Sequence, residues 1–345
     1  MVENDNSSDL SDVKVGILFN SPVMPSKGEN IDYVADAEVE EEVVAVEEAL
    51  GKLGLEYRRL PLKDNAEEFI EALKVYGPDV AINLCEAVFG DSHLEMDVPA
   101  ILELLKVPYT GSSPLALGLC QNKCLAKDVL RARGIPTPRY QVLDSPDDWS
   151  GKIGYPLFVK PLSEDGSIGI TKESFVTDEE TLRKRVEYII NCYRQEALVE
   201  QYIDGREFNV AILGNSEIRI LPISEIVFGF SHGPKIVDYP AKWLKESEEY
   251  KKTMPFCPAE LRSSTRSLVE RAASQAYEAL HCRDYARVDI RLRGRIPYVL
   301  EANPNPDISF DGGFARSLRA ARISYEDFLK EIICSALKRG FVASS

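Results

Sequence analysis

The fold of this chain is decided by two runs, Tyr285-Ala-Arg-Val-Asp-Ile-Arg-Leu292 and Tyr298-Val-Leu-Glu-Ala-Asn303, which a turn around Gly294 separates. Polar residues alternate with apolar ones in both runs, which predicts two β-strands that each have one polar face. Similar short strands recur from residue 155 onward and predict antiparallel pairing. The expected strands are 156–161, 197–203, 208–213, 218–227, 285–292 and 297–303, and the expected helices among them are 178–193 and 258–280. This half of the chain is therefore α+β.

The polar faces of the two runs predict a cluster of oxygen ligands. If the hairpin turns about Arg295, Asp289 lies opposite Glu301 and Arg287 lies opposite Asn303. Two carboxylates and a carboxamide on one face suit Mg²⁺ that is carried by a nucleoside triphosphate, because Mg²⁺ prefers one or two carboxylates together with phosphate oxygens and water. The alternative is a solvent-facing strand surface whose charges pair with one another.

The first part of the chain has a different pattern. Apolar strands at 13–20, 55–60 and 79–84 alternate with helices at 39–53, 66–76 and 97–106. This alternation predicts a doubly wound parallel sheet. After a helix at 122–133, the Pro-rich stretch 135–138 predicts a boundary. We expect an N-terminal α/β domain at 13–120 and a second domain at 121–340, with 155–203 as its small lobe and 204–340 as its C-terminal lobe.

A second chemical pattern follows the strand Leu157-Phe-Val-Lys-Pro161. Lys160 ends an apolar run, and the small-residue loop 163–169 comes next. Backbone N–H groups of such a loop can surround phosphates while the lysine supplies a positive charge. Taken alone, the loop could equally be a hairpin turn. The run 197–203, which breaks into Glu200 and Gln201, could present backbone groups to an adenine.

Composition excludes several classes of protein. The chain has 41 Lys+Arg against 56 Asp+Glu, a formal net charge of −15, which repels polyanions and argues against nucleic-acid partners. It contains no apolar window of about 18 residues, and its first residues are polar and acidic, so we expect no membrane association and a cytoplasmic location. A dinucleotide-dependent oxidoreductase would need a Gly-x-Gly-x-x-Gly turn after the first strand, where this chain has Phe19-Asn-Ser-Pro22.

The order of short sequence motifs along this chain resembles that of the ATP-grasp carboxylate-amine ligases, in particular their D-alanine-D-alanine ligase branch. The similarity extends from Val13 to about Leu337. Its blocks are Val107-Pro-Tyr-Thr-Gly-Ser112, Lys123, Lys160-Pro161, 163–169, Glu200-Gln-Tyr-Ile203, Glu207 to Leu213, Ala241-Lys242, Phe256-Cys-Pro-Ala259, Arg287-Val-Asp289 and Glu301-Ala-Asn303. The resemblance implies an N-terminal α/β domain and two α+β lobes that enclose the nucleotide.

The resemblance also implies residue roles. ATP and Mg²⁺ are the implied cofactors, with Mn²⁺ as an alternative ion. The implied nucleotide contacts are Lys123 and Lys160 to phosphates, Gly166 and Ser167 in the phosphate loop, Glu200, Gln201, Tyr202 and Ile203 to adenine, and Glu207 to ribose. Asp289, Glu301 and Asn303 would hold the metal. A substrate carboxylate would attack the γ-phosphorus near Lys242, and Arg287 would stabilise the tetrahedral oxyanion that forms when an amine displaces phosphate.

The substrate pocket departs from the family pattern. The family follows its metal-binding asparagine with a loop whose glycine N–H grips the second substrate's carboxylate, and Asp307 stands at that glycine. Glu38 matches the glutamate that holds the first substrate's ammonium, but Gly166 and Trp243 stand where the family has a supporting serine and tyrosine. We therefore keep open D-alanyl-D-alanine synthesis, ligation of a different amino acid or small amine, and a non-catalytic ATP-binding paralogue.

Two further expectations concern partners and motion. The expected partners are small-molecule amino-acid or amine substrates, and a homodimer is left open. Residues 163–169 and 230–252 are polar and contain glycine. We expect both segments to be mobile without nucleotide and to close over the phosphates, because an acyl phosphate must be protected from water.

Overall fold

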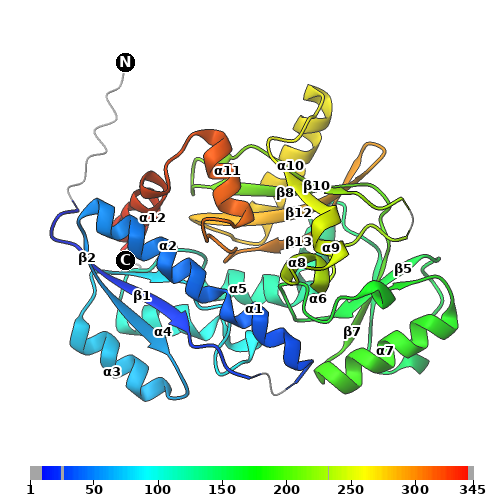
Figure 1. Ribbon diagram of the computed structural model, residues 1–345, viewed down its shortest axis with the longest axis horizontal. Coiled ribbons are helices and arrows are strands. Elements are labelled where there is room, and N and C mark those ends of the chain that lie inside the picture. Colours follow the sequence, from blue (N-terminus) through cyan, green and yellow to red (C-terminus); the bar gives the residue numbers. More distant parts are fainter. Residues whose placement is uncertain (1–9, 25–26, 232, 341–345) are drawn as a thin grey trace.

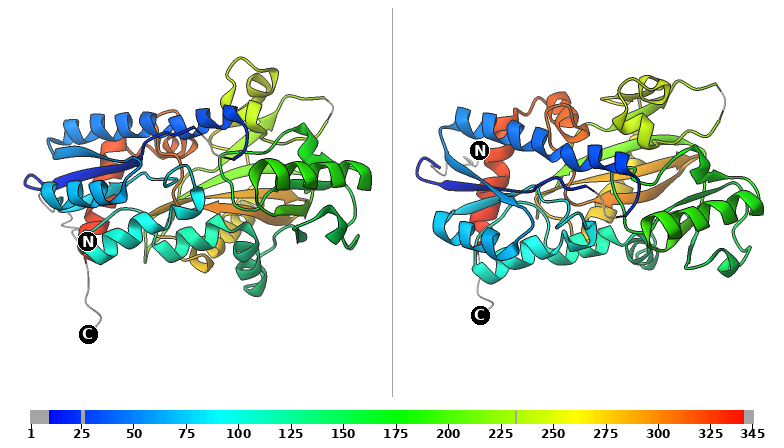
Figure 2. Two further views of the ribbon diagram at one scale, coloured as in Figure 1. Left: turned by 90° about the horizontal axis from the view of Figure 1, so that it is seen from below. Right: turned by 60° about the horizontal axis from the view of Figure 1, so that its bottom comes forward.

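The N-terminal sheet of the computed structural model is parallel, and the model describes residues 10–24, 27–231 and 233–340. Its strand order is β2-β1-β3, with β1 at Lys14–Asn20, β2 at Glu56–Leu62 and β3 at Val80–Asn83. Both neighbours pair with β1 in parallel. The sheet lies at one end of an elongated molecule whose other two sheets continue along its long axis (Figures 1 and 2).

Helices cover both faces of this sheet, because the residues of β1 are apolar on both sides. Ile17 packs on one face against α2 (Val39–Leu53) and α12 (Tyr325–Arg339). Leu18 packs on the other face against α3 (Ala66–Tyr76) and α4 (Asp97–Leu105). The predicted doubly wound α/β arrangement is confirmed.

The end of the chain returns to this first sheet. After the last strand, α11 (Gly313–Ala321) and α12 follow, and α12 packs against α2 and β3. The sequence patterns did not predict this contact, because two helices far apart in the sequence bury their apolar faces against each other. The C-terminal end of the chain therefore contributes to the core of the N-terminal sheet.

The second sheet is four-stranded and antiparallel, in the order β4-β7-β5-β6. Its strands are β4 (Tyr140–Leu143), β7 (Ala197–Gln201), β5 (Leu157–Pro161) and β6 (Phe175–Val176). Helix α7 (Glu179–Tyr193) covers one face with Leu182, Val186 and Ile189. Helices α5 (Pro114–Gln121) and α6 (Lys123–Ala132) connect this sheet to the first one.

The third sheet is six-stranded and carries the predicted hairpin. Its order is β11-β10-β8-β12-β13, with β9 paired to β8. The strands are β8 (Arg206–Leu213), β9 (Arg219–Ile220), β10 (Ser224–Phe228), β11 (Thr253–Phe256), β12 (Tyr285–Arg293) and β13 (Ile296–Asn303), and α10 (Ser263–Ala279) packs on them.

The register of β12 and β13 confirms the sequence prediction. Asp289 lies opposite Glu301, and Arg287 lies opposite Asn303. A β-bulge follows Asp289, between it and Ile290. Bulges re-aim neighbouring side chains, and this one adjoins the expected metal ligand.

Two segment predictions are corrected by the structure. The single strand expected at 218–227 is wrong, because Pro222 has no N–H to donate and divides it into β9 and β10. The helix expected from 258 begins at Ser263, because the backbone N–H of Ala259 donates to the carbonyl of Ile223 instead. The segment 230–252 contains two short helices, α8 (Tyr239–Trp243) and α9 (Glu248–Lys252). Among the described residues, no helix combines the length and apolar character needed to cross a lipid bilayer.

Candidate active site

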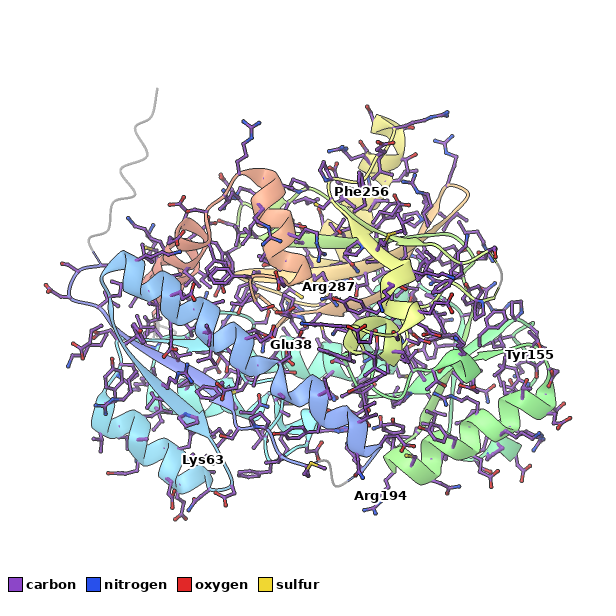
Figure 3. The ribbon with its side chains drawn as sticks, in the orientation of Figure 1. Glu38, Lys63, Tyr155, Arg194, Phe256 and Arg287 are labelled. Carbon is purple, nitrogen blue, oxygen red and sulfur yellow. The ribbon has the colours of Figure 1, made fainter. Side chains whose placement is uncertain are left out.

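A cavity of about 1020 Å³ lies between strands of the second and third sheets and the helices α1 (Tyr33–Ala37) and α2. All the residues predicted for the site except Asn303 line it: Glu38, Lys123, Lys160, Gly166, Ser167, Glu200, Gln201, Tyr202, Ile203, Glu207, Lys242, Arg287, Asp289 and Glu301. Figure 3 shows Glu38 and Arg287 near the middle of the molecule, on separate elements. Segments that are far apart in the sequence thus contribute to one site.

The predicted metal ligands lie on the polar face of β12 and β13. Arg287 and Asp289 share one face of β12, and the guanidinium donates from Nε to Asp289 Oδ1 at 2.9 Å and from Nη2 to Oδ2 at 3.0 Å. Asn209 on β8 donates to Asp289 Oδ1 at 2.6 Å. Burial alone would lower the pKa of Arg287, but the neighbouring Asp289 carboxylate raises it above its usual range.

These oxygens fit a hydrated magnesium ion. Asp289 and Glu301 are a cross-strand pair of hard ligands, and Asn303 accepts from the backbone N–H of Asn305 at 3.0 Å. No three His, Cys, Asp or Glu side chains gather into a metal-binding group in the described part of the chain. A cation here would need further oxygen ligands, which suits Mg²⁺ bound together with phosphates.

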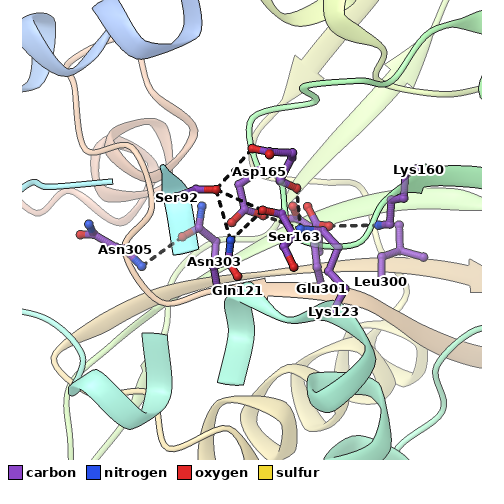
Figure 4. Close-up of polar contacts among 12 residues, drawn as sticks. Ser92, Gln121, Lys123, Lys160, Ser163, Asp165, Leu300, Glu301, Asn303 and Asn305 are labelled. Carbon is purple, nitrogen blue, oxygen red and sulfur yellow. Dashed lines mark hydrogen bonds and ion pairs between the residues drawn. The ribbon is translucent and has the colours of Figure 1, made fainter. Parts of the chain in front are cut away.

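A series of alternating charges runs beside this pair, and Figure 4 shows the ion pair between two of its members, Lys160 and Glu301. Lys160 Nζ lies 3.2 Å from Glu301 Oε2 and 3.5 Å from Glu200 Oε1. Lys127 Nζ lies 2.9 Å from the other oxygen of Glu200, as an ion pair, and donates to the carbonyl of Leu300 at 3.0 Å. The sequence analysis missed Lys127, although it follows Lys123 by one helical turn on α6 and so shares its face.

The pKa values of Lys160, Glu200 and Glu301 favour their charged forms. Burial opposes ionisation of Glu301, but Lys160, Lys123 and Arg287 together bring its pKa well below the usual range. Burial likewise opposes a charged Lys160, yet the carboxylates of Glu200 and Glu301 raise its pKa. The pKa of Glu200 is lowered by the two lysines despite its burial. Glu301, Glu200 and Lys160 are therefore held in their charged forms, whereas burial lowers the pKa of Lys127.

The phosphate loop is held at its base by buried polar groups. Lys123 Nζ donates to the carbonyl of Glu164 at 2.6 Å and to Asp165 Oδ1 at 2.8 Å. Gln121 donates to the carbonyl of Ser163 at 2.6 Å. Gly166, at the top of the loop, has φ +63°, a left-handed conformation that glycine adopts without strain.

The two segments predicted to close over the phosphates contact each other. The indole Nε1 of Trp243 donates to the carbonyl of Gly166 at 2.7 Å, and Ser167 Oγ donates to the carbonyl of Val237 at 2.9 Å. The ammonium of Lys242 lies 4.4 Å from the centre of the Trp243 ring. Trp243 thus links the loop 163–169 to Lys242, at the place where the family has a serine and a tyrosine. The mobility of the two segments stays a prediction.

The expected adenine and ribose end is organised by Arg291, which the sequence analysis missed. Its guanidinium donates to Glu207 Oε2 at 2.8 and 2.6 Å and to the carbonyl of Ile203 at 3.0 Å. Burial raises the pKa of Glu207, and Arg291 partly offsets this. The signal was present in the sequence, since the alternation that places Arg287 and Asp289 on one strand face also includes Arg291.

Several carboxyl groups gather near Glu38 and Asp307, which line the opposite end of the cavity. Glu38 lies at the start of α2, and Glu86 follows β3 at the carboxyl edge of the parallel sheet, where ligands bind in open α/β folds. Burial, and then the nearby Asp307, raises the pKa of Glu38 to about 7. Glu86 has an exposed surface, yet protein on its other sides raises its pKa to about 8, against the opposing effect of Lys242. Burial also raises the pKa of Glu42, which lies one turn after Glu38.

Comparison with known proteins agrees with this geometry. The family model described as D-ala D-ala ligase C-terminus matches residues 129–334. A D-alanine--D-alanine ligase of Bordetella avium is 31% identical over 328 residues, which cover 94% of each chain. An uncharacterized protein of Sinorhizobium fredii is 37% identical over 263 residues, 76% of each chain.

Solved structures give the same result at the level of the fold. The D-alanine--D-alanine ligase of Bacillus anthracis complexed with ATP superposes with a TM-score of 0.71 and 26% identity, covering 94% of this chain and 98% of the other. The VanG D-Ala:D-Ser ligase of Enterococcus faecalis has a TM-score of 0.72 at 18% identity, covering 94% and 99%, and this likeness concerns the fold alone.

Proposed function

Since this chain belongs to the D-alanine-D-alanine ligase family of ATP-grasp enzymes and is an ATP-dependent carboxylate-amine ligase, we propose that it activates an amino-acid carboxylate as an acyl phosphate. An amine then displaces the phosphate and a peptide-type bond forms. One observation carries this proposal: Asp289, Glu301 and Arg287 on the β12–β13 hairpin face the same cavity as Lys160 and Glu38 from other parts of the chain.

ATP occupies the end of the cavity beneath the phosphate loop. Lys123 and Lys160 bind its phosphates, with the N–H groups of Gly166 and Ser167 in the loop. The segment from Glu200 through Gln201 and Tyr202 to Ile203 binds adenine. Glu207 accepts from a ribose hydroxyl, which its geometry allows because both hydrogen bonds from Arg291 end on Oε2.

Asp289, Glu301 and Asn303 would hold the magnesium ion, with Mn²⁺ as a substitute. Such an ion would supply positive charge that neutralises the phosphates at this site. Its present neighbours support this role, because Arg287 and Lys160 compensate the two carboxylates that face the cavity.

The protein groups then act on the substrates. A carboxylate oxygen of the first substrate forms a bond to the γ-phosphorus as the bond to the ADP oxygen breaks, with Lys242 beside the transferred group. The amine attacks the carbonyl carbon, and Arg287 stabilises the resulting oxyanion until phosphate leaves and the amine loses a proton. Glu38 binds the ammonium of the first substrate, since a nearby cation favours its ionised form at neutral pH.

D-alanine is the substrate named for the relatives, and we propose it as the first choice for both positions. A second candidate is the ligation of a different amino acid or small amine. Asp307 favours it, because this carboxylate lines the cavity at the place where the family holds a substrate carboxylate. Gly166 and Trp243, which replace the family's serine and tyrosine, favour it too.

Phosphate release from Mg·ATP, measured with D-alanine and with other D- and L-amino acids, tests the proposal, with product masses identifying the bond formed. We expect release that depends on both ATP and an amino acid and is lost in Arg287→Ala. Silence with all amino acids while Mg·ADP still binds would contradict ligation. The resemblance extends the proposal to a cytoplasmic homodimer, and sedimentation of the purified chain tests the dimer.

A further inference from the structure

Residues 27–34, which we call the strap, lie between the N-terminal sheet and the other two sheets. The strap comes after β1, runs into α1, and leads to α2, the helix at whose start Glu38 lies. Figures 1 and 2 show α1 close to one end of α7. Val34 of the strap lines the same cavity as Glu38 and Lys242. The strap therefore forms part of the cavity wall.

The strap is hydrogen-bonded to the end of α7, which covers the second sheet. The backbone N–H of Gly28 donates to the carbonyl of Cys192 at 2.8 Å, and the hydroxyl of Tyr193 donates to Asp32 Oδ2 at 3.2 Å. Gly28 has φ +81°, and a Cβ on it would meet Asp32 Oδ2 at 2.6 Å and Tyr193 Cε1 at 2.8 Å. Only glycine fits this contact without displacing the strap from α7.

The strap also contacts both segments that are expected to close over the phosphates. Lys27 Nζ lies 3.1 Å from Oε1 of Glu164, in the loop 163–169. The hydroxyl of Tyr239, on α8, donates to the carbonyl of Ile31. Because the strap is continuous with α2, these contacts must break before α7, the loop or α8 can move away from the N-terminal sheet.

Polar groups, and not apolar packing, hold the strap in place. No strap residue belongs to a buried apolar cluster, and Ile31, Tyr33 and Val34 are 43%, 37% and 42% exposed. Asp32 is buried, yet its Oδ1 has no hydrogen-bond partner among the described residues, and burial raises its pKa. An unsatisfied buried acceptor is unfavourable, and segments with few buried apolar contacts open locally. The strap can therefore detach while the sheets stay folded.

We propose that the strap is a third closing segment, which detaches from α7 and α8 to admit the amino-acid substrates and binds back before the acyl phosphate forms. This inference rests on the proposed ligase function and deepens it. Water that attacks the acyl phosphate breaks its bond to phosphate and returns the free acid, so ATP is consumed without a peptide bond. Gly28 and Tyr193 do not line the cavity, so they are positioning residues for the strap.

The first test measures how tightly ATP use is coupled to bond formation. Phosphate and dipeptide are quantified in the same reaction with Mg·ATP and D-alanine, or another amino acid that supports turnover. Gly28→Ala should raise the ratio of phosphate to dipeptide, because the new Cβ holds the strap off α7. Tyr193→Phe should raise it by about 2- to 10-fold, since one hydrogen bond is lost. Gly51→Ala is the control, because no atom lies within 4 Å of its Cβ position. An unchanged ratio in both strap variants overturns the inference.

The second test prevents the strap from opening. Cys192 Sγ lies 3.6 Å from Glu29 Oε1, so Glu29→Cys brings a second thiol close to Cys192. Glutathione disulfide oxidises the two thiols to a disulfide, which intact mass verifies. Turnover of the crosslinked variant should fall by at least about 10-fold and return when the disulfide is reduced. Glu29→Cys/Cys192→Ser should not respond to the oxidant. Equal turnover in the crosslinked and reduced forms overturns the inference.

Hydrogen exchange tests the strap without turnover. Amides of 27–34 should exchange faster than those of β1, which lies in the core, and Tyr193→Phe should speed their exchange by roughly 2- to 10-fold. Tyr57→Phe, on the exposed side of β2, is the control and should change nothing. Exchange in 27–34 that is as slow as in β1 overturns the strap's opening even if the chain is a ligase. Absence of phosphate release with every amino acid contradicts ligation instead, whatever the exchange shows.

Discussion

The two ends of the cavity differ in how their charges are compensated. At the nucleotide end, Lys127, Glu200, Lys160 and Glu301 form a buried series of opposite charges. At the substrate end, burial and then the neighbouring carboxylates raise the pKa of Glu38, while Lys242 and Lys245 lower it. The first set is paired before any ligand binds, whereas within the described part of the chain neither Glu38 nor Asp307 forms an ion pair.

This difference shows which parts of the site are preorganised by the protein. Balanced charges keep fixed positions and need little reorganisation when ATP binds, which is how electrostatic preorganisation supports phosphoryl transfer. Unbalanced charges raise the free energy of the empty site, so a substrate with the complementary charge gains binding energy there. In the proposed function, the nucleotide end serves the chemistry common to the family, and the substrate end determines which substrates are joined.

The largest expected effect follows from disturbing the metal ligands. Asp289→Asn or Glu301→Gln removes one formal charge with little change in size. Turnover should fall by on the order of 10³-fold or more, because the variant binds the ion that neutralises the phosphate charge more weakly. Phosphate release measures the loss, and circular dichroism should show an unchanged fold. A variant with full activity would exclude its residue from the metal site.

The next effect is on stability at the nucleotide end. Lys127→Met should lower the free energy of unfolding by about 3–5 kcal/mol, because it removes one partner of a buried ion pair and leaves Glu200 with Lys160 alone. Urea unfolding measures it. Lys184→Met is the control, since its pair with Glu180 is exposed and solvent screens it, so its loss should leave stability nearly unchanged. Equal losses in the two variants would show that burial does not set the strength of the first pair.

The third prediction concerns the substrate end, where ionisation of the carboxyl groups should lower the stability of the folded protein. The folded pKa values of Glu38 and Glu86, about 7 and 8, lie above the unfolded value of 4.5. The folded chain therefore binds more protons between these limits, and stability should fall as pH rises from about 5 to about 8. Each group contributes at most about 1.4 kcal/mol per pH unit, less for Glu86 because its surface is exposed.

Urea unfolding across this range measures the slope. In Glu38→Gln/Glu86→Gln the slope should flatten, because neither group can titrate. Stability that rises with pH in wild type, or an unchanged slope in the double variant, would show that these carboxyl groups are not the ones that destabilise the substrate end.

The smallest effect concerns the contact between the two closing segments. Trp243→Phe removes the hydrogen bond to Gly166 but keeps an aromatic ring beside Lys242. A single hydrogen bond contributes about 0.5–1.5 kcal/mol, so the KM for ATP should rise by roughly 2- to 10-fold. Hydrogen exchange of 163–169 should also become faster without nucleotide, and Mg·ATP should slow it in both proteins. Exchange that is equally slow with and without nucleotide would mean that these segments do not close.

Much of the nucleotide end could be predicted from the sequence. The alternation in 285–292 and 298–303 fixes which side chains share a strand face. The pairing of Asp289 with Glu301 also depends on the bulge, because the turn between Arg293 and Ile296 alone would place Asp289 opposite Leu300. Lys127 and Arg291 could have been found by the same periodicities, since each shares a face with a residue that was identified. Local geometry was sufficient here because strand and helix periods are constant.

The sequence by itself determined the order of the main elements, which side chains share the polar face of each hairpin strand, and the charges available to the site. Only the tertiary structure decided which groups meet: Glu38 and Glu86 with Asp307, Trp243 with Gly166, and the strap with the end of α7. These contacts join loops and helix ends from separate parts of the chain. Loop geometry has no fixed period, and the meeting of distant segments depends on how whole sheets and helices bury their apolar faces, as α12 does against α2.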